Sequence, residues 1–265
     1  MKYISHLFSD MDGTLLNSQK NVSQENIDSI TEFTDNGGHF AVATGRSPEI
    51  SLPFLADIPV TAPSILYNGA GIYDFSKHKF LHKEFLPKEI LKQIVDISIQ
   101  EYPFICIEAF AEGPIQLLNK DCIIDHYITD EKQPHRFASY HTGEQYMKFL
   151  LYAEPSALQT VCQKLQPIME NKVSYTFSSP FYLEILPLNV SKGSALKWIC
   201  KNCKINLQNV AAIGDFDNDC EMLRYAALSA APNNASSAAL AAAKYIVSSN
   251  DHSCVSNFLK KHILT

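Results

Sequence analysis

The first 45 residues alternate apolar runs with one amphipathic run. Residues 3–10 and 39–45 are apolar and predict strands, whereas residues 23–38 have the spacing of a helix. Ser23 stands where an N-cap is expected, and a glycine pair ends the helical run. A strand, a helix and a second strand at this spacing are typical of a parallel, buried βαβ unit.

The pattern changes in the middle of the chain. Residues 64–75 and 79–86 predict two extended segments joined by a turn. From about residue 87, strands joined by short loops occur together with two helices, which is typical of an α+β unit. The predicted helices are 87–102 and 155–170, and the predicted strands are 104–110, 114–119, 148–154, 173–179 and 181–188.

The α/β alternation returns after residue 189. The predicted segments are helix 191–202, strand 209–215, helix 217–227, strand 228–232, helix 235–245, strand 245–249 and helix 254–264. The run 235–245 is rich in alanine, the strongest helix former, so we expect a packed helix there. The predicted fold class is α/β: a Rossmann-like, doubly wound parallel-sheet core over residues 1–81 and 188–265, with an inserted α+β cap over residues 82–187.

Composition narrows the class of protein. Of 265 residues, 46% are hydrophobic and 19% are charged, which is typical of a soluble globular protein. The net charge of -6 disfavours a nucleic-acid partner. No apolar run reaches the roughly 18 residues of a membrane span, and a charged residue comes too early for a signal peptide. We therefore expect a cytoplasmic protein that is a monomer or a small homo-oligomer.

The seven cysteines are irregularly spaced, which fits a reducing compartment better than a disulfide framework. Cys200 and Cys203 form a C-x-x-C pair, but they lie in a helical pattern, and no second pair follows at zinc-site spacing. We expect structural cysteines there. A metal or redox pair is the alternative.

Two carboxylates directly follow the first predicted strand. Asp10 and Asp12 stand one residue apart, before Gly13 and Thr14, which suit a sharp turn that the threonine hydroxyl can stabilise. Ligands of open parallel sheets bind beyond the carboxyl ends of the strands. Asp10 could therefore act as a nucleophile and Asp12 as a proton donor. A solvated acidic turn is the alternative.

A second acidic cluster follows the strand 209–215. Asp215, Asp217 and Asp219 come before a helix, with Asn218 between the last two. Two carboxylate-bearing strand ends in one sheet would repel each other unless a cation lay between them, and oxygen ligands favour magnesium. A helix N-terminus also attracts acids, but it would not account for the first cluster.

Two further segments could provide positive charge and N–H groups. Thr44, Gly45 and Arg46 follow the strand 39–45, where hydroxyl and backbone N–H groups can bind phosphate oxygens. Lys192 stands at a helix N-terminus, where the helix dipole disfavours a cation. Pairing with carboxylates and a phosphate would explain that position. A solvated surface lysine is the alternative.

Four segments in this order, DMDGTLL, ATGRS, SKG and GDFDNDCEML, resemble the motifs of the haloacid dehalogenase superfamily of aspartate-nucleophile phosphatases. The NGA at residues 68–70 and the insert between ATGRS and SKG resemble its Cof-type branch, subfamily IIB. The resemblance spans essentially the whole chain. It implies magnesium-dependent hydrolysis of a small phosphorylated metabolite, such as a sugar phosphate, through an aspartyl-phosphate.

The resemblance also implies roles for single residues. Asp10 matches the nucleophile, and Asp12 matches the general acid/base, for which we expect a pKa raised by crowding with other acids. Magnesium is expected on the Asp10 carboxylate, the Asp12 backbone carbonyl and Asp215, with Asp219 and Arg46 in supporting roles. The expected phosphate ligands are Met11 (through its N–H), Thr44, Gly45, Lys192 and Asn218.

Two other functions remain open, a phosphomutase with the same aspartate chemistry and a non-catalytic phosphate-binding regulatory module. A response-regulator receiver is excluded because it lacks the two-residue aspartate spacing and a cap. The cap is expected to provide specificity, with His126, Arg136, His141, Tyr182 and Glu184 as candidate contacts. The chain departs from the family pattern in two stretches. AAPNNAS stands where MGNA is usual, with Asn234-Ala235 in the matching place, and Cys254 stands where glycine is usual.

Overall fold

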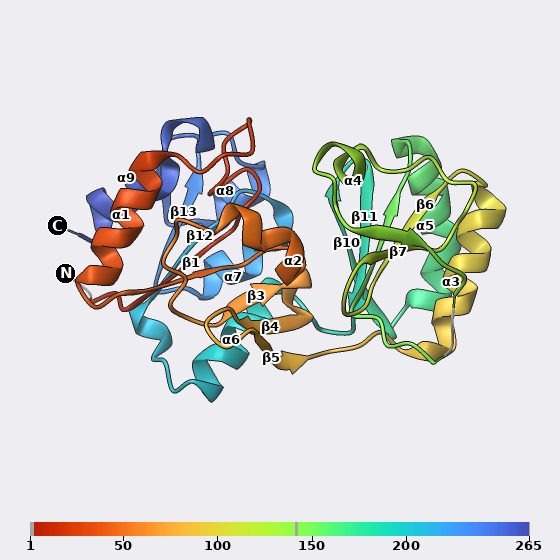
Figure 1. The fold of residues 1–265 in the computed structure, drawn as a ribbon, viewed down its shortest axis with the longest axis horizontal. Coiled ribbons are helices and arrows are strands. Elements are labelled where there is room, and N and C mark those ends of the chain that lie inside the picture. Colours follow the sequence, from red (N-terminus) through yellow and green to blue (C-terminus); the bar gives the residue numbers. More distant parts are fainter. Residues whose placement is uncertain (1–2, 141–142, 265) are drawn as a thin grey trace. The chain divides into compact units, whose positions relative to one another are not determined.

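The computed structural model describes residues 3–140 and 143–264. His141, one of the candidate cap residues, lies outside the described residues. The chain divides into two compact units, Met1–His82 together with Ser191–Thr265 and Lys83–Val190 (Figure 1). Each unit has its own sheet and is described separately.

The first unit contains a five-stranded, all-parallel sheet in the order β14-β13-β12-β1-β2. Its strands are β1 (His6–Ser9), β2 (His39–Val42), β12 (Val210–Ile213), β13 (Leu228–Pro232) and β14 (Tyr245–Val247). Ser9, the last residue of β1, stands opposite Ile213 of β12 and Val42 of β2. The loops that follow these three strands therefore leave the same edge of the sheet side by side.

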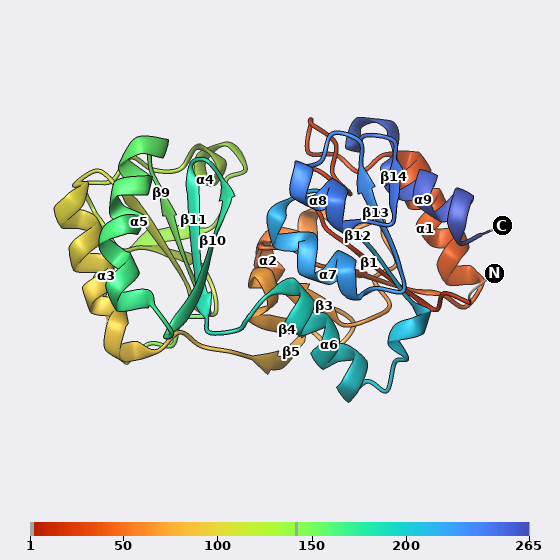
Figure 2. The same cartoon turned by 180° about the vertical axis from the view of Figure 1, so that it is seen from behind.

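Helices cover both faces of this sheet (Figures 1 and 2). One face carries α1 (Gln24–Asp35) and α9 (Cys254–His262), and the other carries α6 (Lys192–Asn202), α7 (Cys220–Tyr225) and α8 (Ser237–Ala242). Phe8 of β1 packs with buried residues of α6, α7 and α8. Successive strand residues point to opposite faces, so both faces of the strands are apolar. The doubly wound α/β class predicted from the sequence is confirmed.

Helix boundaries follow the predicted caps in some places and not in others. Ser23 is the N-cap of α1, and its hydroxyl accepts the Asn26 N–H. The prediction of a helix over 235–245 is wrong at its end: α8 stops at Ala242, because Tyr245 begins a strand that pairs with β13. The predicted helix 217–227 begins as one 3-10 turn, and the α-helix starts only at Cys220.

A small three-stranded sheet covers residues 64–83, and a turn divides the first of the two extended segments predicted there, 64–75. It consists of β3 (Ser64–Leu66), β4 (Gly71–Asp74) and β5 (Lys79–Lys83). The turn between β3 and β4 has Tyr67 and Asn68 with φ of 51° and 53°, in the left-handed region. Hydrophobic alternation does not encode such a turn, so the break within 64–75 was not predicted.

Several short elements were also not predicted from the sequence. They are α2 (Pro48–Ser51), α4 (His126–Asp130), β8 (His135–Phe137) and 3-10 turns at Leu52–Phe54, Tyr67–Gly69, Leu207–Asn209 and Asn250–His252. Three to five residues are too few for a periodic pattern to emerge.

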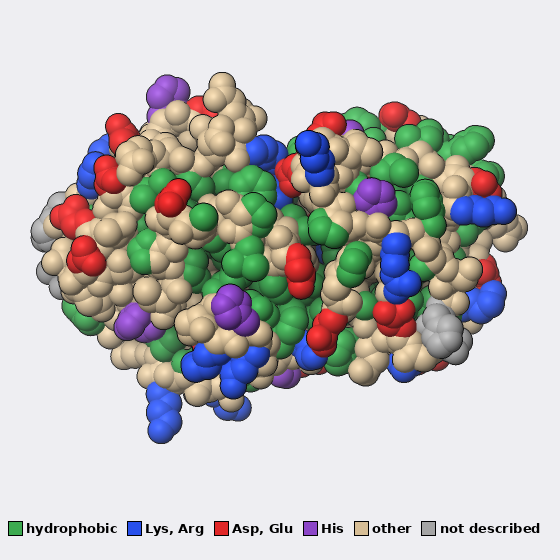
Figure 3. All heavy atoms as spheres, viewed as in Figure 1, with side chains coloured by type: hydrophobic (Ala, Val, Ile, Leu, Met, Phe, Trp, Pro, Cys, Tyr) green, Lys and Arg blue, Asp and Glu red, His purple; other side chains and the backbone are tan. Residues whose placement is uncertain are grey.

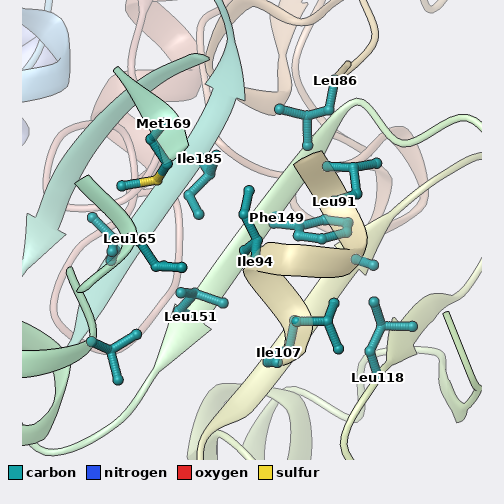
Figure 4. Close-up of a cluster of buried hydrophobic side chains, with 14 of the residues drawn as sticks. Leu86, Leu91, Ile94, Ile107, Leu118, Phe149, Leu151, Leu165, Met169 and Ile185 are labelled. Atoms are coloured by element: carbon teal, nitrogen blue, oxygen red, sulfur yellow. The ribbon is translucent and has the colours of Figure 1, made fainter. Parts of the chain in front are cut away.

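The second unit is a six-stranded sheet in the order β10-β11-β9-β6-β7-β8. Its other strands are β6 (Cys106–Phe110), β7 (Ile115–Leu117), β9 (Lys148–Tyr152), β10 (Val173–Ser179) and β11 (Tyr182–Pro187). Two helices, α3 (Lys88–Glu101) and α5 (Pro155–Met169), lie together on one face of this sheet. Figure 4 shows the core between them, where Ile94 and Leu165 meet Phe149 and Leu151 of β9.

Acidic, basic and apolar side chains are interspersed on the face in view in Figure 3. Across the described ranges, 3–140 and 143–264, no helix is long and apolar enough to cross a bilayer.

Candidate active site

Asp10 is the first residue after β1, at the carboxyl edge of the parallel sheet. Its amide donates to the carbonyl of Ile213 on β12 at 2.9 Å, which fixes the backbone beside the neighbouring strand. The residue is 5% exposed. Burial raises the pKa of Asp10 well above its usual range, opposed by Lys192 and reinforced by Asp219 and Asp215.

Lys192 is the first residue of α6, and it is 1% exposed. Its Nζ donates to Asp10 Oδ1 at 2.6 Å and to Asp219 Oδ1 at 2.7 Å. Burial lowers the pKa of Lys192, but the two carboxylates outweigh this effect and raise it above its usual value. The lysine is therefore a buried, charged ammonium group that joins the two acidic segments.

Asp215 and Asp219 lie in the loop and 3-10 turn after β12. Asp219 Oδ2 accepts the backbone N–H groups of Asp215 and Phe216 at 3.0 and 3.1 Å. Asp215 Oδ1 accepts the Thr14 hydroxyl at 2.9 Å. Burial, followed by the nearby Asp219, raises the pKa of Asp215 to about 6. Thr14 thus links the loop after β1 to the loop after β12.

The carboxylates of Asp10, Asp215 and Asp219 offer oxygen atoms that all lie within 4.8 Å of one another. Both oxygens of Asp219 already accept hydrogen bonds, one from Lys192 and one from backbone amides. Three carboxylates facing one ammonium group leave an excess of negative charge, and oxygen donors suit a hard divalent cation. The residues therefore fit a divalent cation held chiefly by Asp10 and Asp215.

Asp12 has a different environment from the one we predicted. Arg46 donates to both of its oxygens, at 2.7 and 2.8 Å, and Lys20 Nζ donates to Oδ1 at 2.5 Å. Burial alone would raise the pKa of Asp12, but Arg46 and Lys20 outweigh it and hold the pKa well below its usual range. The predicted raised pKa is thus wrong, because the Asp12 side chain turns to two cations and not to the other acids.

Gly13 allows this turn. Its φ is +76°, and an added Cβ would lie 2.4 Å from Asp215 Oδ2. Next to it, the buried backbone carbonyl of Met11 accepts the Leu16 N–H at 2.8 Å, which closes the turn that holds Asp10 and Asp12.

The remaining candidate phosphate ligands form a second group beside β2. Thr44 is buried, and its Oγ1 accepts the Arg46 N–H at 3.2 Å, which leaves the hydroxyl proton available to donate. Gly45 packs against the side chain of Asn68, and Asn218 Nδ2 donates to Asn68 Oδ1 at 3.1 Å. Asn68 thereby joins the loop after β2 to the turn after β12.

No role in the site was predicted from the sequence for Lys20, Asn68 or Cys254. A surface lysine carries no sequence signal, whereas an asparagine before glycine does indicate a left-handed turn. Cys254, the departure from the family pattern, donates its thiol to the Thr14 carbonyl at 3.1 Å. In the other departing stretch, AAPNNAS, Asn234 donates to Asn250 Oδ1, and Asn250 Nδ2 donates to the Leu16 carbonyl. Both departures therefore support the loop after β1.

The C-x-x-C pair lies away from these contacts. Cys200 is buried in α6 and Cys203 is its exposed C-cap. Burial, with the neighbouring Cys203, raises the pKa of the Cys200 thiol to about 11, and burial raises that of Cys203 as well. Reactive thiols instead have lowered pKa values, so neither cysteine is activated.

The fold and these contacts define an α/β class of protein whose clustered carboxylates lie at the carboxyl edge of a parallel sheet. The chain belongs to the haloacid dehalogenase-like hydrolase family, which it matches over residues 7–259. The predicted family and the predicted class of enzyme, a phosphatase-type hydrolase, are thereby confirmed.

Named relatives and a solved structure support this assignment. Two Bacillus subtilis proteins, both named 5-amino-6-(5-phospho-D-ribitylamino)uracil phosphatase (YitU and YcsE), are 25% and 26% identical to this chain. The matches cover 96% of this chain and 95% and 94% of theirs. The crystal structure of a haloacid dehalogenase-like hydrolase from Bacteroides thetaiotaomicron, 24% identical, has the same fold, with a TM-score of 0.85 over 98% of this chain and 99% of that chain.

Proposed function

We propose that this protein is a magnesium-dependent phosphatase that hydrolyses a small phosphorylated metabolite through an aspartyl-phosphate on Asp10. The observation that carries the proposal is the buried Asp10 carboxylate, held by Lys192 beside Asp215 and Asp219 at the edge of the sheet. Buried carboxylates with strongly shifted pKa values are common at reactive sites. This one also lies where parallel sheets bind their ligands.

The chemistry proceeds in two displacements at phosphorus. In the first, an Asp10 oxygen forms a bond to phosphorus while the ester oxygen leaves and takes a proton from Asp12. In the second, water attacks phosphorus, its proton goes to Asp12, and the Asp10 carboxylate is released with inorganic phosphate. Lys192, Thr44, Asn218 and the backbone N–H groups around Met11 and Gly45 would stabilise the phosphoryl oxygens.

Magnesium would be held by Asp10, the Asp12 backbone carbonyl and Asp215. When bound, it supplies positive charge against the phosphoryl oxygens. Asp219, whose two oxygens are already engaged by Lys192 and by backbone amides, holds the lysine and the loop.

The ion pairs of Asp12 bear on its proposed role. With Arg46 and Lys20 in place the carboxylate is ionised, which suits the base that accepts a proton from water. To donate a proton to the leaving group, Asp12 must first separate from at least one of these cations. Arg46 is therefore proposed to control the position and charge of Asp12.

The substrate is proposed to be a small phosphomonoester, such as a sugar phosphate, whose organic part is selected by the unit 83–190 acting as a cap. Relatives named for a phosphoribitylamino-uracil make that compound one of the candidates. We also propose a cytoplasmic location for the protein. A phosphomutase remains the second candidate, because it would use the same aspartate.

The test is a phosphate-release assay with p-nitrophenyl phosphate and a panel of phosphorylated metabolites, with and without Mg²⁺. We expect inorganic phosphate as the product, only with the metal present. An isomerised sugar phosphate without free phosphate would instead identify a mutase. No reaction on any ester would favour a non-catalytic phosphate-binding module.

A further inference from the structure

The cap unit buries ionisable side chains on the face of its sheet opposite α3 and α5. Glu108 (β6), Lys148 (β9), Glu184 (β11) and Asp125, the N-cap of α4, are each only 3–4% exposed. Glu108 and Glu184 both stand opposite Leu150 of β9, one on either side. Buried charge destabilises a fold unless it is well paired, so packing alone does not account for this group.

Three of these side chains have partners. Lys148 Nζ lies 3.1 Å from Glu184 Oε2 and 4.5 Å from the centre of the Phe110 ring. Asp125 Oδ1 accepts the Tyr182 hydroxyl at 2.7 Å and the Tyr127 N–H at 3.1 Å.

Glu108 is only partly satisfied. Its Oε1 is buried and has no hydrogen-bond partner within residues 3–140 and 143–264, and it is the one carboxylate oxygen there of which this is true. Burial raises the pKa of Glu108 well above its usual range, and the adjacent Asp125 adds to this effect. An orphaned buried acceptor is destabilising until a donor reaches it. Glu108 Oε1 is therefore available to accept a hydrogen bond from an O–H or N–H group of a ligand.

Aromatic rings lie beside these acceptors. The Tyr182 ring centre is 5.4 Å from that of Tyr152 and 6.1 Å from that of Tyr127. Tyr182 is the same residue whose hydroxyl donates to Asp125. Tyrosine rings offer apolar faces to the carbon skeleton of a ligand, next to acceptors for its polar groups.

The charge balance indicates which ligands fit. Lys148 is shared, because it pairs with Glu184 and also acts on the Glu108 carboxyl group. Asp125 Oδ1 lies 3.2 Å from His126 Nδ1, so three carboxyl groups still outnumber the cationic groups near them. A second phosphate or a carboxylate at this place would meet like charge in a buried setting. A neutral hydroxyl or amino group would not.

We propose that Glu108 and Asp125 form a subsite that accepts hydrogen bonds from a hydroxyl or amino group on the organic part of the phosphate ester and disfavours esters with a second anionic group. This proposal rests on the phosphatase function proposed above. It assigns Glu108 and Asp125, neither of which was a sequence candidate, to specificity rather than to the chemical step.

The kinetic test compares esters that differ only in the part the subsite would bind. Ribose 5-phosphate and glucose 6-phosphate carry hydroxyl groups, p-nitrophenyl phosphate has no donor in its leaving group, and 3-phosphoglycerate carries a second anion. Glu108→Leu should raise KM for the sugar phosphates about tenfold, the loss of roughly one hydrogen bond. It should leave kcat/KM for p-nitrophenyl phosphate within about threefold, since the core residues are untouched.

Two further variants distinguish binding from folding. Glu108→Gln retains a carbonyl acceptor and should give an intermediate KM, and the exposed Glu112→Gln, in the same unit, should match wild type. Equal losses on all esters would overturn the proposal in favour of a structural role. A wild-type preference for 3-phosphoglycerate over the sugar phosphates would also overturn it.

A binding measurement separates this proposal from the phosphatase function. Glucose 6-phosphate is titrated calorimetrically into Asp10→Asn protein with and without Glu108→Leu. A Kd about tenfold weaker in the double variant supports the subsite even if wild-type protein hydrolyses no ester. Equal Kd values, or no binding to either protein, contradict it.

Discussion

At the scale of single residues, the proposed chemistry depends on one buried carboxylate. Asp10 accepts a hydrogen bond from Lys192 and lies beside the carboxylates of Asp215 and Asp219. Asp10→Asn keeps the size and an oxygen acceptor but removes the nucleophile. We expect kcat to fall at least about a thousandfold.

The same variant should remain folded, because Asp219 still pairs with Lys192. Circular dichroism and the melting temperature serve as controls for this point. If the variant has a normal melting temperature and its activity is within tenfold of wild type, Asp10 is not the nucleophile.

The sequence predicted residues with a strong chemical pattern and missed those defined by geometry. Asp10, Asp215, Asp219 and Lys192 were all named from their positions after strands or at a helix start. Asp12 was named too, but its charge environment was predicted wrongly, because a contact with Arg46 across 34 positions leaves no local signal. Its second partner, Lys20, was not named because a lysine in a loop carries no sequence signal of its own.

At the scale of elements, Gly69 sets how closely the β3–β4 turn approaches the start of α6. An added Cβ there would lie 2.2 Å from the Ser191 carbonyl oxygen, and φ is +109°. Gly37 has a similar positive φ of +83°, but nothing lies within 4 Å of its added Cβ. Substitution of Gly69 would cause both a steric clash and backbone strain, whereas substitution of Gly37 would cause backbone strain alone.

Gly69→Ala should destabilise the protein by about 2–4 kcal/mol, since the backbone strain and the clash add. It should also lower kcat, because the displaced Ser191 precedes Lys192. Gly37→Ala should lose only about 1 kcal/mol and keep its activity. Chemical denaturation and kcat for both variants test this, and equal effects of the two changes would show that the close approach is unimportant.

The pair of β1 and β2 brings two histidines together. The rings of His6 and His39 lie 4.8 Å apart on neighbouring strands. Burial, followed by His39, lowers the pKa of His6 to about 4. An unfolded histidine titrates at about 6.5. As pH falls from 6.5 to 4, only the unfolded chain gains this proton, so the free energy of unfolding should decrease.

His6→Gln should remove part of this decrease, about 1–2 kcal/mol between pH 7 and pH 4 once solvent screening of the partly exposed ring is considered. Urea denaturation of wild type and variant at both pH values measures it. An unchanged pH dependence in the variant would show that His6 is not responsible.

The periodic elements could be read from the sequence, and the short ones could not. Strands β1, β2 and β12 appear as continuous apolar runs because both of their faces are buried. The turn at Asn68 and the four-residue α2 depend on backbone conformation and tertiary contacts, which hydrophobic spacing does not record.

At the scale of the whole molecule, metal binding should couple the two acidic loops to stability. Mg²⁺ is proposed to bind the carboxylate group of the folded protein and not the unfolded chain, so it should raise the melting temperature as its concentration rises. Asp215→Asn should abolish most of this shift, and Asp217→Asn, outside the carboxylate group, should retain it.

Chelation of the metal by EDTA should abolish turnover, and added Mg²⁺ should restore it. A melting temperature that does not change with Mg²⁺ concentration, together with full activity in EDTA, would show that the enzyme does not need the metal. The thermal measurement needs no substrate, so it remains informative even when the assay ester is wrong.

The central claim is that a phosphoryl group passes through Asp10, and trapping that intermediate tests it most directly. Asp12→Ala removes both the acid of the first displacement and the base that activates water. With Mg²⁺ and p-nitrophenyl phosphate, whose leaving group needs no proton, the first displacement can still proceed, so the phosphoenzyme should accumulate. Acid quenching and peptide mass spectrometry should then find one phosphoryl group, on the peptide containing Asp10. Normal turnover by Asp12→Ala with no phosphorylated peptide, or phosphate on any other residue, would contradict the account.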